Sequence, residues 1–325
     1  MSVNQTEDNR GRQATSPWHI PPLGWRDISW RVWRELKEDN ISMVAAAVAF
    51  YVMLSLFPSI TALGSIYGLL ADPADVQVQL SYVKDIMPEQ AWGLINDQLT
   101  SVAAAGESKL GWSALTGILL ALWTAGAGVR AMMTALNIAY DETEKRNILV
   151  FYFYALLITL GGIITAVVAL TTIVAVPVVM SYLRLYGPAQ EYLPSGFITS
   201  LRWPVMALMV FLGILFLYRF SVSRNNPRTR WAIPGALLSS MLWIVVSMLF
   251  SFFVSKFGNY DETYGAMGAV VILMLWFWIS TYVILLGAEF NAEIEHQTHH
   301  DTTVGSSRDL GDRGAYVADN IGPVP

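Results

Sequence analysis

The sequence predicts an all-α fold: a polytopic integral membrane protein with six transmembrane helices and additional amphipathic interfacial helices. Only 14% of the 325 residues are charged and 54% are hydrophobic, whereas soluble domains carry roughly 25% charged residues. The apolar residues gather in six runs, each on the order of 20 residues or more, which is enough for a helix to cross ~30 Å of hydrocarbon. The runs are Ile41–Leu70, Leu110–Val129, Ile148–Met180, Leu201–Phe220, Trp231–Val254 and Gly265–Phe290.

The segment before the first run, residues 1–40, is expected to be a cytoplasmic tail with a basic amphipathic helix. Basic residues lie mostly off an apolar stripe with helical spacing, which consists of Trp25, Ile28, Val32, Trp33 and Leu36. Tryptophans beside basic residues favour a helix in the headgroup region of the inner leaflet. The alternative is a soluble helix that packs on the cytoplasmic loops.

Residues 41–290 form the predicted six-helix transmembrane domain, and its first and third runs are longer than a bilayer requires. Pro58 lies inside the first run and Pro177 inside the third. A proline in a helix interior removes a backbone hydrogen bond, so we expect bends at these positions. Bent helices line substrate sites in transporters, but they also let a long helix fit a bilayer.

Two connecting segments are expected on the external side. Residues 71–109 are acidic and have the pattern of two amphipathic helices, which would cap the bundle or lie on the outer leaflet. Residues 182–197 are a shorter stretch with prolines and aromatic residues, as expected at a membrane interface. The C-terminal segment 291–325 is expected to be a cytoplasmic tail, disordered from Thr302 on because it is rich in Gly, Ser and Asp.

The distribution of basic residues predicts the orientation. The two terminal segments and the loops after the second and fourth runs hold fifteen Lys and Arg, whereas the opposite side holds five. Cytoplasmic loops carry the excess of Lys and Arg. Both termini are therefore expected in the cytoplasm, in agreement with an even number of spans.

Arg130 and Glu289 are the charged candidates at membrane depth. Arg130 ends the second run and Glu289 nearly ends the sixth, and both spans are expected to run from outside to inside. An ion pair would neutralise two costly charges and tie the two helices together. The alternative is that each side chain reaches water separately.

Other polar candidates are weighed mainly as packing residues. Tyr51 and Ser55 lie one turn apart just before Pro58, and Asn137 and Tyr140 lie on a short cytoplasmic helix after the second run. Each could contact a substrate, but side chains of this kind more often serve helix packing.

The residues favour no enzymatic site. No Gly-rich phosphate loop, nucleophile elbow or intramembrane carboxylate pair is present, and the chain has no cysteine. His296 and His300 have the spacing of two metal ligands on a continuing helix, but no further ligand is evident. We therefore expect no catalytic residues, no metal and no cofactor.

Three stretches resemble the YihY/BrkB family of bacterial inner-membrane proteins. They are DNISMVAAAVAFYVMLSLFP at Asp39–Pro58, ALNIAYDETEKR at Ala135–Arg146 and YGAMGAVVILMLWFWISTYVILLGAEFNAE at Tyr264–Glu293. The resemblance implies six helices and a place in the inner membrane. The residues that match positions of the family's motifs are Ser55, Pro58, Asn137, Tyr140, Arg146, Tyr264, Gly265, Gly268, Trp276, Gly287, Glu289 and Asn291.

Many members of that family are labelled ribonuclease BN, a label that implies metal-dependent tRNA processing. Ribonucleases of that name carry an H-x-H-x-D-H metal motif, and the nearest string here, from His296 to Asp301, does not match it. No basic groove for nucleic acid is apparent. The leading hypothesis is envelope-related transport or handling of an amphiphile or small solute, with membrane lipids as partners. The alternative is a non-transporting scaffold for envelope partners, a nuclease is the least favoured, and an oligomer is left open.

Overall fold

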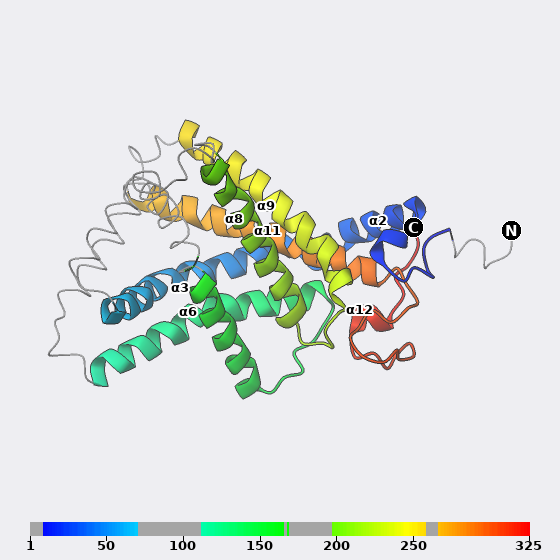
Figure 1. The fold of residues 1–325 in the computed structure, drawn as a ribbon, viewed down its shortest axis with the longest axis horizontal. Helices are drawn as coiled ribbons and strands as arrows, with labels where there is room; N and C mark the ends of the chain where they lie inside the picture. Colours follow the sequence, from blue (N-terminus) through cyan, green and yellow to red (C-terminus); the bar gives the residue numbers. More distant parts are fainter. Residues whose placement is uncertain (1–8, 71–111, 166–167, 169–196, 258–265) are drawn as a thin grey trace, which may run out of the picture.

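The computed structural model describes residues 9–70, 112–165, 168, 197–257 and 266–325, and these form a helical protein with one isolated β-bridge between Pro227 and Thr303 (Figure 1). A helix over Ile148–Thr165 lies between α6 and α8 in the sequence. The remaining helices are η1 (Pro17–His19), α2 (Pro22–Glu38), α3 (Ile41–Leu70), α6 (Trp112–Ala139), α8 (Phe197–Phe220), α9 (Thr229–Phe257), α11 (Ala266–Glu295) and α12 (Tyr316–Asp319).

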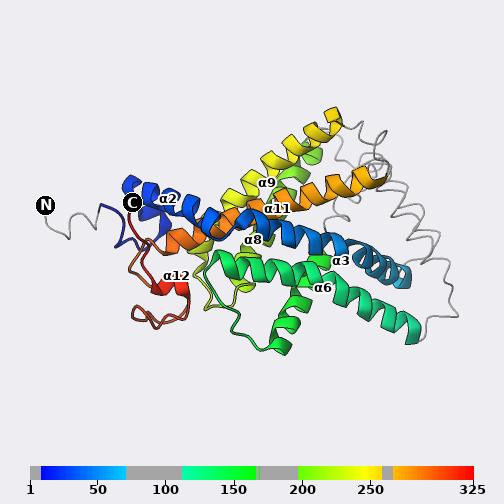
Figure 2. The ribbon, with the colours of Figure 1, turned by 180° about the vertical axis from the view of Figure 1, so that it is seen from behind.

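The long helices pack around α3 and α11. Helix α3 lies along α6, α11 packs against α3 and α9, and α8 packs against α9 (Figures 1 and 2). The largest buried cluster joins these helices through side chains such as Ile41, Leu136, Tyr218 and Leu285. This core lies toward the end of the bundle that carries both terminal segments.

Within the described residues, four helices are long and apolar enough to cross a membrane, or five if α2 and the first half of α3 count as one broken span. The four are Ile148–Thr165, Trp203–Phe220, Thr229–Val254 and Val270–Glu295, and the break between α2 and α3 is a bend of 59°. All-helical architecture and apolar spans are thus confirmed. Six transmembrane helices stay a prediction, and Pro177 and the segments 71–109 and 182–196 lie outside the described residues.

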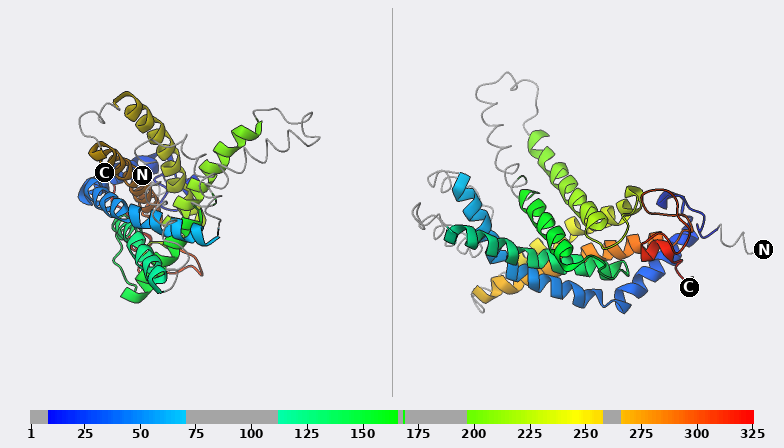
Figure 3. Two further views of the ribbon diagram at one scale, coloured as in Figure 1. Left: turned by 90° about the vertical axis from the view of Figure 1, so that its left-hand side faces the viewer. Right: turned by 90° about the horizontal axis from the view of Figure 1, so that it is seen from below.

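Helix α3 continues through Pro58 as a single helix. The right-hand view of Figure 3 shows its cyan end turning away from the line of its blue part, as an interior proline predicts.

The C-terminal segment differs from the disordered tail that its composition suggested. It packs against the N-terminal segment, and we call residues 9–38 and 296–325 together the terminal cap. The buried Arg12 guanidinium donates to the carbonyls of His296 and Gly322, and Arg313 donates to that of Ala318. Because the Arg12 bonds join residues 284 and 310 positions apart, composition alone could not show that the tail is held in place.

Helix α2 turns its predicted apolar stripe toward the protein. Ile28 and Val32 are buried, and Trp25 stacks on Phe290 of α11 with ring centroids 5.8 Å apart. Trp33 is the exception, with 63% of its surface exposed, and the Lys37 ammonium lies 4.5 Å from the centre of its ring. Most of the stripe therefore packs on α11, the first turn of α9 and the segment before α2. A place for this helix in the headgroup region stays a prediction.

The loops after the second and fourth apolar runs, which the distribution of Lys and Arg predicts on one side of the membrane, meet at one end of the molecule. Asn137 at the end of α6 contacts the loop after α8 through Ser223, and Asn225 of that loop contacts the terminal cap at Arg313. The terminal segments and these loops thus share one end, as predicted. Which side of a membrane that end faces stays a prediction.

Candidate functional site

A groove of about 500 Å³ lies between α3, α6 and the helix Ile148–Thr165. We call it the Arg130 groove. Its walls are mainly apolar, with small residues such as Ala47 and Ala131, and its polar groups include Tyr51 and Arg130. The structure thus brings together two residues that the sequence put forward separately.

Arg130 is held in this groove by aromatic rings. Its guanidinium carbon lies 5.1 Å from the ring centre of Trp123 and 4.9 Å from that of Tyr152, and Nη2 donates to the Trp123 carbonyl at 3.2 Å. Gly126 makes room, because a methyl group there would lie 2.8 Å from Nη1. A cation over aromatic faces is stabilised without a carboxylate and keeps donors for an anion.

The hypothesised ion pair between Arg130 and Glu289 is not formed in the structure. Glu289 is 2% exposed, and its Oε1 has no hydrogen-bond partner among the described residues. Its neighbourhood includes Asp39 at the end of α2, whose pKa rises to about 6, mainly through burial and then through repulsion from Asp141 and Glu35. Similar depth in the membrane does not decide which way a side chain points around its helix axis, and here Arg130 lies against Trp123 and Tyr152.

Ser55 serves the packing of α3 on α6. Its hydroxyl donates to the Val52 carbonyl at 2.8 Å, and the side chain is buried where Gly128 brings α6 close. A methyl group at Gly128 would lie 3.0 Å from Val52 and 3.1 Å from the Ser55 hydroxyl. Pro58 follows one turn later in the same helix.

Asn291 ties α11 to the beginning of α9. Its side-chain oxygen accepts from the Gly235 backbone N–H at 2.7 Å, and its amide donates to the Ala232 carbonyl at 3.0 Å. This side chain is fully buried and faces helix backbone, so its role is helix packing.

Asn137 and Tyr140 organise the loops at the cap end of α6. Asn137 accepts from the Ser223 backbone N–H at 2.8 Å and donates to Glu144 at 3.0 Å. Tyr140 is fully buried, and the Arg224 guanidinium lies 4.6 Å from its ring centre. Burial raises the pKa of the Tyr140 hydroxyl, although the charge of Arg224 acts to lower it. Both residues therefore hold the loop structure and lie outside the Arg130 groove.

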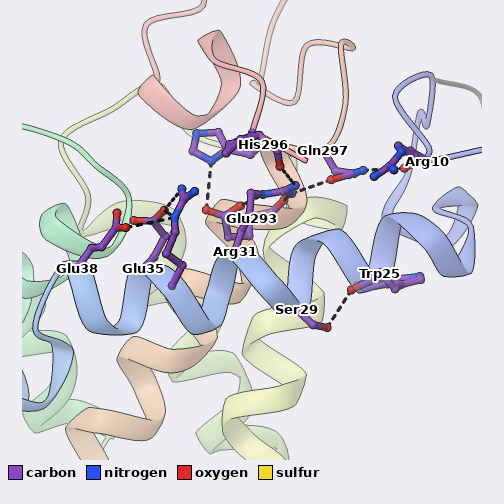
Figure 4. A network of polar contacts seen from close by, with 12 residues as sticks. Arg10, Trp25, Ser29, Arg31, Glu35, Glu38, Glu293, His296 and Gln297 are labelled. Atoms are coloured by element: carbon purple, nitrogen blue, oxygen red, sulfur yellow. Dashed lines mark hydrogen bonds and ion pairs between the residues drawn. The ribbon is translucent and has the colours of Figure 1, made fainter. Parts of the chain in front are cut away.

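Sequence reasoning missed the ion pairs that hold the terminal cap. Arg31 is fully buried on α2, where its Nε donates to Glu293 and its Nη2 to Gln297 at 2.7 Å (Figure 4). Arg224 forms a similar buried pair with Glu295 at 2.6 Å. Partners so far apart in the chain leave no local pattern. Trp123 and Tyr152 were also missed, because aromatic residues are common in membrane helices.

The proposed metal-ligand spacing at His296 and His300 does not persist in three dimensions. Helix α11 ends at Glu295, so the two histidines do not share a helix face. His296 is buried, with Nδ1 3.4 Å from Glu293 and its ring against Tyr316, whereas His300 is exposed. The part of the chain that the structure describes contains no group of three or more His, Asp or Glu residues arranged for a metal ion.

A family model described as virulence factor BrkB matches residues 32–309. The chain belongs to the BrkB family. A ribonuclease-like protein of Bacillus subtilis, YfkH, is 30% identical over 76% of this chain and 88% of its own length. A UPF0761 membrane protein of Idiomarina loihiensis is 24% identical over 81% of this chain and 88% of its own. Another from Alteromonas mediterranea is 28% identical over 83% and 88%.

No solved structure matches the chain. The relatives confirm the resemblance to the YihY/BrkB family and the assignment as a membrane protein. The match covers the Arg130 groove, the Arg224–Glu295 pair, Glu293 without its partner Arg31, and all eight candidate residues put forward from the sequence.

Proposed function

We propose that this BrkB-family protein binds and moves an amphiphile or small solute at the bacterial inner membrane, with the Arg130 groove as its contact site. The observation that carries the proposal is that Arg130 lies in a mainly apolar groove and has no carboxylate partner among the described residues. Apolar walls fit an acyl chain, and the guanidinium fits an anionic headgroup. The positive-inside distribution of Lys and Arg supports cytoplasmic termini.

Lipid movement in proteoliposomes tests this function. The purified protein would be reconstituted with a fluorescently labelled phosphatidylglycerol, and dithionite quenching would measure how fast the label crosses the bilayer. We expect faster crossing than in protein-free vesicles. Arg130→Gln is expected to slow it about tenfold, because one charged contact contributes about 1.4 kcal/mol. Arg26→Gln, on an exposed part of α2, is the matched control and should leave the rate unchanged.

Two outcomes would speak against the proposal. Folded protein that moves no labelled lipid, and no small anionic solute in a parallel flux assay, would remove the transport function. Transport that is equally fast in the Arg130→Gln variant would remove the groove as its site.

A scaffold for envelope partners is the second candidate, and the terminal cap favours it. Both terminal segments fold into one unit there, and the unit exposes Trp18 and Trp33 to 65% and 63%. Large exposed aromatic side chains are common in docking surfaces. This function predicts proteins that co-purify with the wild type and are lost when both tryptophans are replaced by serine, with no flux in either case.

We do not propose an enzyme. The ribonuclease-like name describes the Bacillus relative, and here His296 is engaged by Glu293 and packs on Tyr316. Any nuclease activity in a preparation should therefore separate from this protein on further purification. Activity that follows the protein through every column would overturn this inference.

A further inference from the structure

A second groove, of about 350 Å³, lies on another side of the helix Ile148–Thr165, between its first turns and the loop after α8. We call it the basic groove. Its lining includes the cations Lys145, Arg146 and Arg224 and the aromatic side chains of Tyr154 and Phe220. None of the described residues that line it is a carboxylate. Three cations from two separate loops thus converge on one small space.

Among the described residues, each of these cations has hydrogen-bond donors without a partner. Lys145 is 56% exposed and donates once from Nζ, to Glu142. Arg146 uses Nε and Nη2 for Glu144 and the Ser221 carbonyl, which leaves Nη1. The Arg224 side chain is 1% exposed, and its Nε and Nη1 have no hydrogen-bond partner among the described residues.

The acidic partners of these cations lie on the side away from the groove and do not line it. Glu142 and Glu295 are buried, and they hold Lys145 and Arg224 from the protein side. Burial alone would raise the pKa of Glu144, but hydrogen bonds from Arg146 and Asn137 hold it at about 2. These carboxylates fix the positions of the cations, while the charged side chains that line the groove, among the described residues, are all positive.

The groove also lies next to the ends of two candidate membrane spans, where lipid headgroups are expected. Lys145 and Arg146 directly precede one candidate span, and Arg224 follows the end of α8 at Phe220 by four residues. Tyr154 belongs to that span, and the Arg146 guanidinium lies 5.3 Å from its ring centre. Aromatic rings next to basic groups are typical of the membrane–water interface.

We propose that the basic groove is a binding site for a phosphate group, held by Lys145, Arg146 and Arg224. The phosphate belongs either to the headgroup of an anionic phospholipid or to a soluble phosphorylated molecule. Planar guanidinium groups and an ammonium group are the donors that proteins use for phosphate. The volume admits one headgroup, while Tyr154 and Phe220 offer apolar surface to the adjoining glycerol or acyl carbons. The site is separate from the Arg130 groove and requires no transport.

Binding to full-length protein in dodecyl maltoside, which carries no phosphate, tests the site. Native mass spectrometry would count added phosphatidylglycerol at increasing concentration, with and without inorganic phosphate as competitor. We expect the Lys145→Gln/Arg146→Gln variant to bind at least tenfold more weakly, because each lost charged hydrogen bond contributes up to about a tenfold change. Arg230→Gln, an exposed cation outside the groove, should bind within about twofold of the wild type.

The outcomes separate the two phosphate sources. If inorganic phosphate displaces bound phosphatidylglycerol, the groove binds phosphate groups from either source. If phosphate cannot displace the lipid, the groove is a site for a lipid headgroup. Phosphate binding without lipid binding assigns it to soluble phosphates. Equal affinities in the wild type and the double variant, or no binding of either probe by folded wild type, would overturn the site. The single variant Lys145→Gln changes only an exposed side chain and should remain folded. Weaker binding by this variant would therefore support the site even if the double variant were unstable.

Discussion

Replacing Gly287 by alanine tests the contact between α9 and α11, which carries the packing of the sixth apolar run. A methyl group on Gly287 would overlap the Ser239 hydroxyl and would lie 2.6 Å from the Gly235 carbonyl oxygen and 2.7 Å from the Tyr218 hydroxyl. The Ser239 hydroxyl is itself fixed, because it donates to the Val283 carbonyl at 2.9 Å. The methyl group therefore meets backbone and anchored side chains, and the two helices must move apart.

The expected loss of stability follows from two opposing terms. Extra methyl groups in a packed core cost about 1–3 kcal/mol, and a backbone neighbour favours the upper end of that range. Alanine gains about 1 kcal/mol over glycine in a helix. The net loss for Gly287→Ala is then about 2 kcal/mol. Gly162 offers a matched control, because nothing lies within 4 Å of a methyl group built there, so Gly162→Ala should gain up to about 1 kcal/mol.

Thermal unfolding in detergent, followed by tryptophan fluorescence, measures the difference between the two variants. A difference of about 3 kcal/mol corresponds to a gap of roughly 6 °C or more at about 2 °C per kcal/mol. Removing the hydroxyl with Ser239→Ala should rescue part of the Gly287→Ala loss, as a double-mutant cycle would show. Equal melting temperatures for Gly287→Ala and Gly162→Ala would refute the reasoning.

Three further predictions concern the polar contacts. Arg31→Gln leaves the buried Glu293 without its cation, so we expect a loss of about 3–5 kcal/mol and faster hydrogen exchange in residues 296–325. Exchange at the wild-type rate would contradict the pairing. Asn291→Leu should cost about 2–3 kcal/mol in unfolding free energy, because two buried backbone groups of α9 lose their partner; a loss below about 0.5 kcal/mol would show that they find another. The pKa of Asp39 rises from 3.8 to about 6 on folding, so the folded state binds this proton more tightly and stability falls as pH rises through that window. Asp39→Asn should therefore raise the melting temperature at pH 8 but not at pH 3.5, and an equal gain at both pH values would count against this cause.

Local pattern predicted the long helices well. The observed α3 begins and ends with the first apolar run, Ile41–Leu70, and α8 ends with the fourth run at Phe220. Length and hydropathy suffice for this because a span must satisfy its own backbone hydrogen bonds in lipid, whatever its neighbours are. The same reasoning could not count the helices that pack together or say which sides face one another.

Arg130 shows which features of a candidate site can be predicted from sequence. Its position near a span end was enough to mark it as unusual. Its partner was not predictable, because direction around the helix axis decides between Glu289 and the aromatic rings of Trp123 and Tyr152. The tail beyond Thr302 shows the same limit, since the carbonyls of Gly322 and Pro323 accept hydrogen bonds from Arg12 and from Arg31 of α2.

The sequence by itself determined that this is a membrane protein, that the terminal segments and two of its loops share one end of the molecule, and that it belongs to one family, because apolar run length, charge placement and ordered motifs are local properties. Only the tertiary structure decided where the charges go. It paired Arg31 with Glu293 and Arg224 with Glu295, left Arg130 among aromatic rings, and gathered three cations into the basic groove. The physical reason is that a buried charge is stabilised by whatever group the fold places beside it, and residues far apart in the chain supply that group.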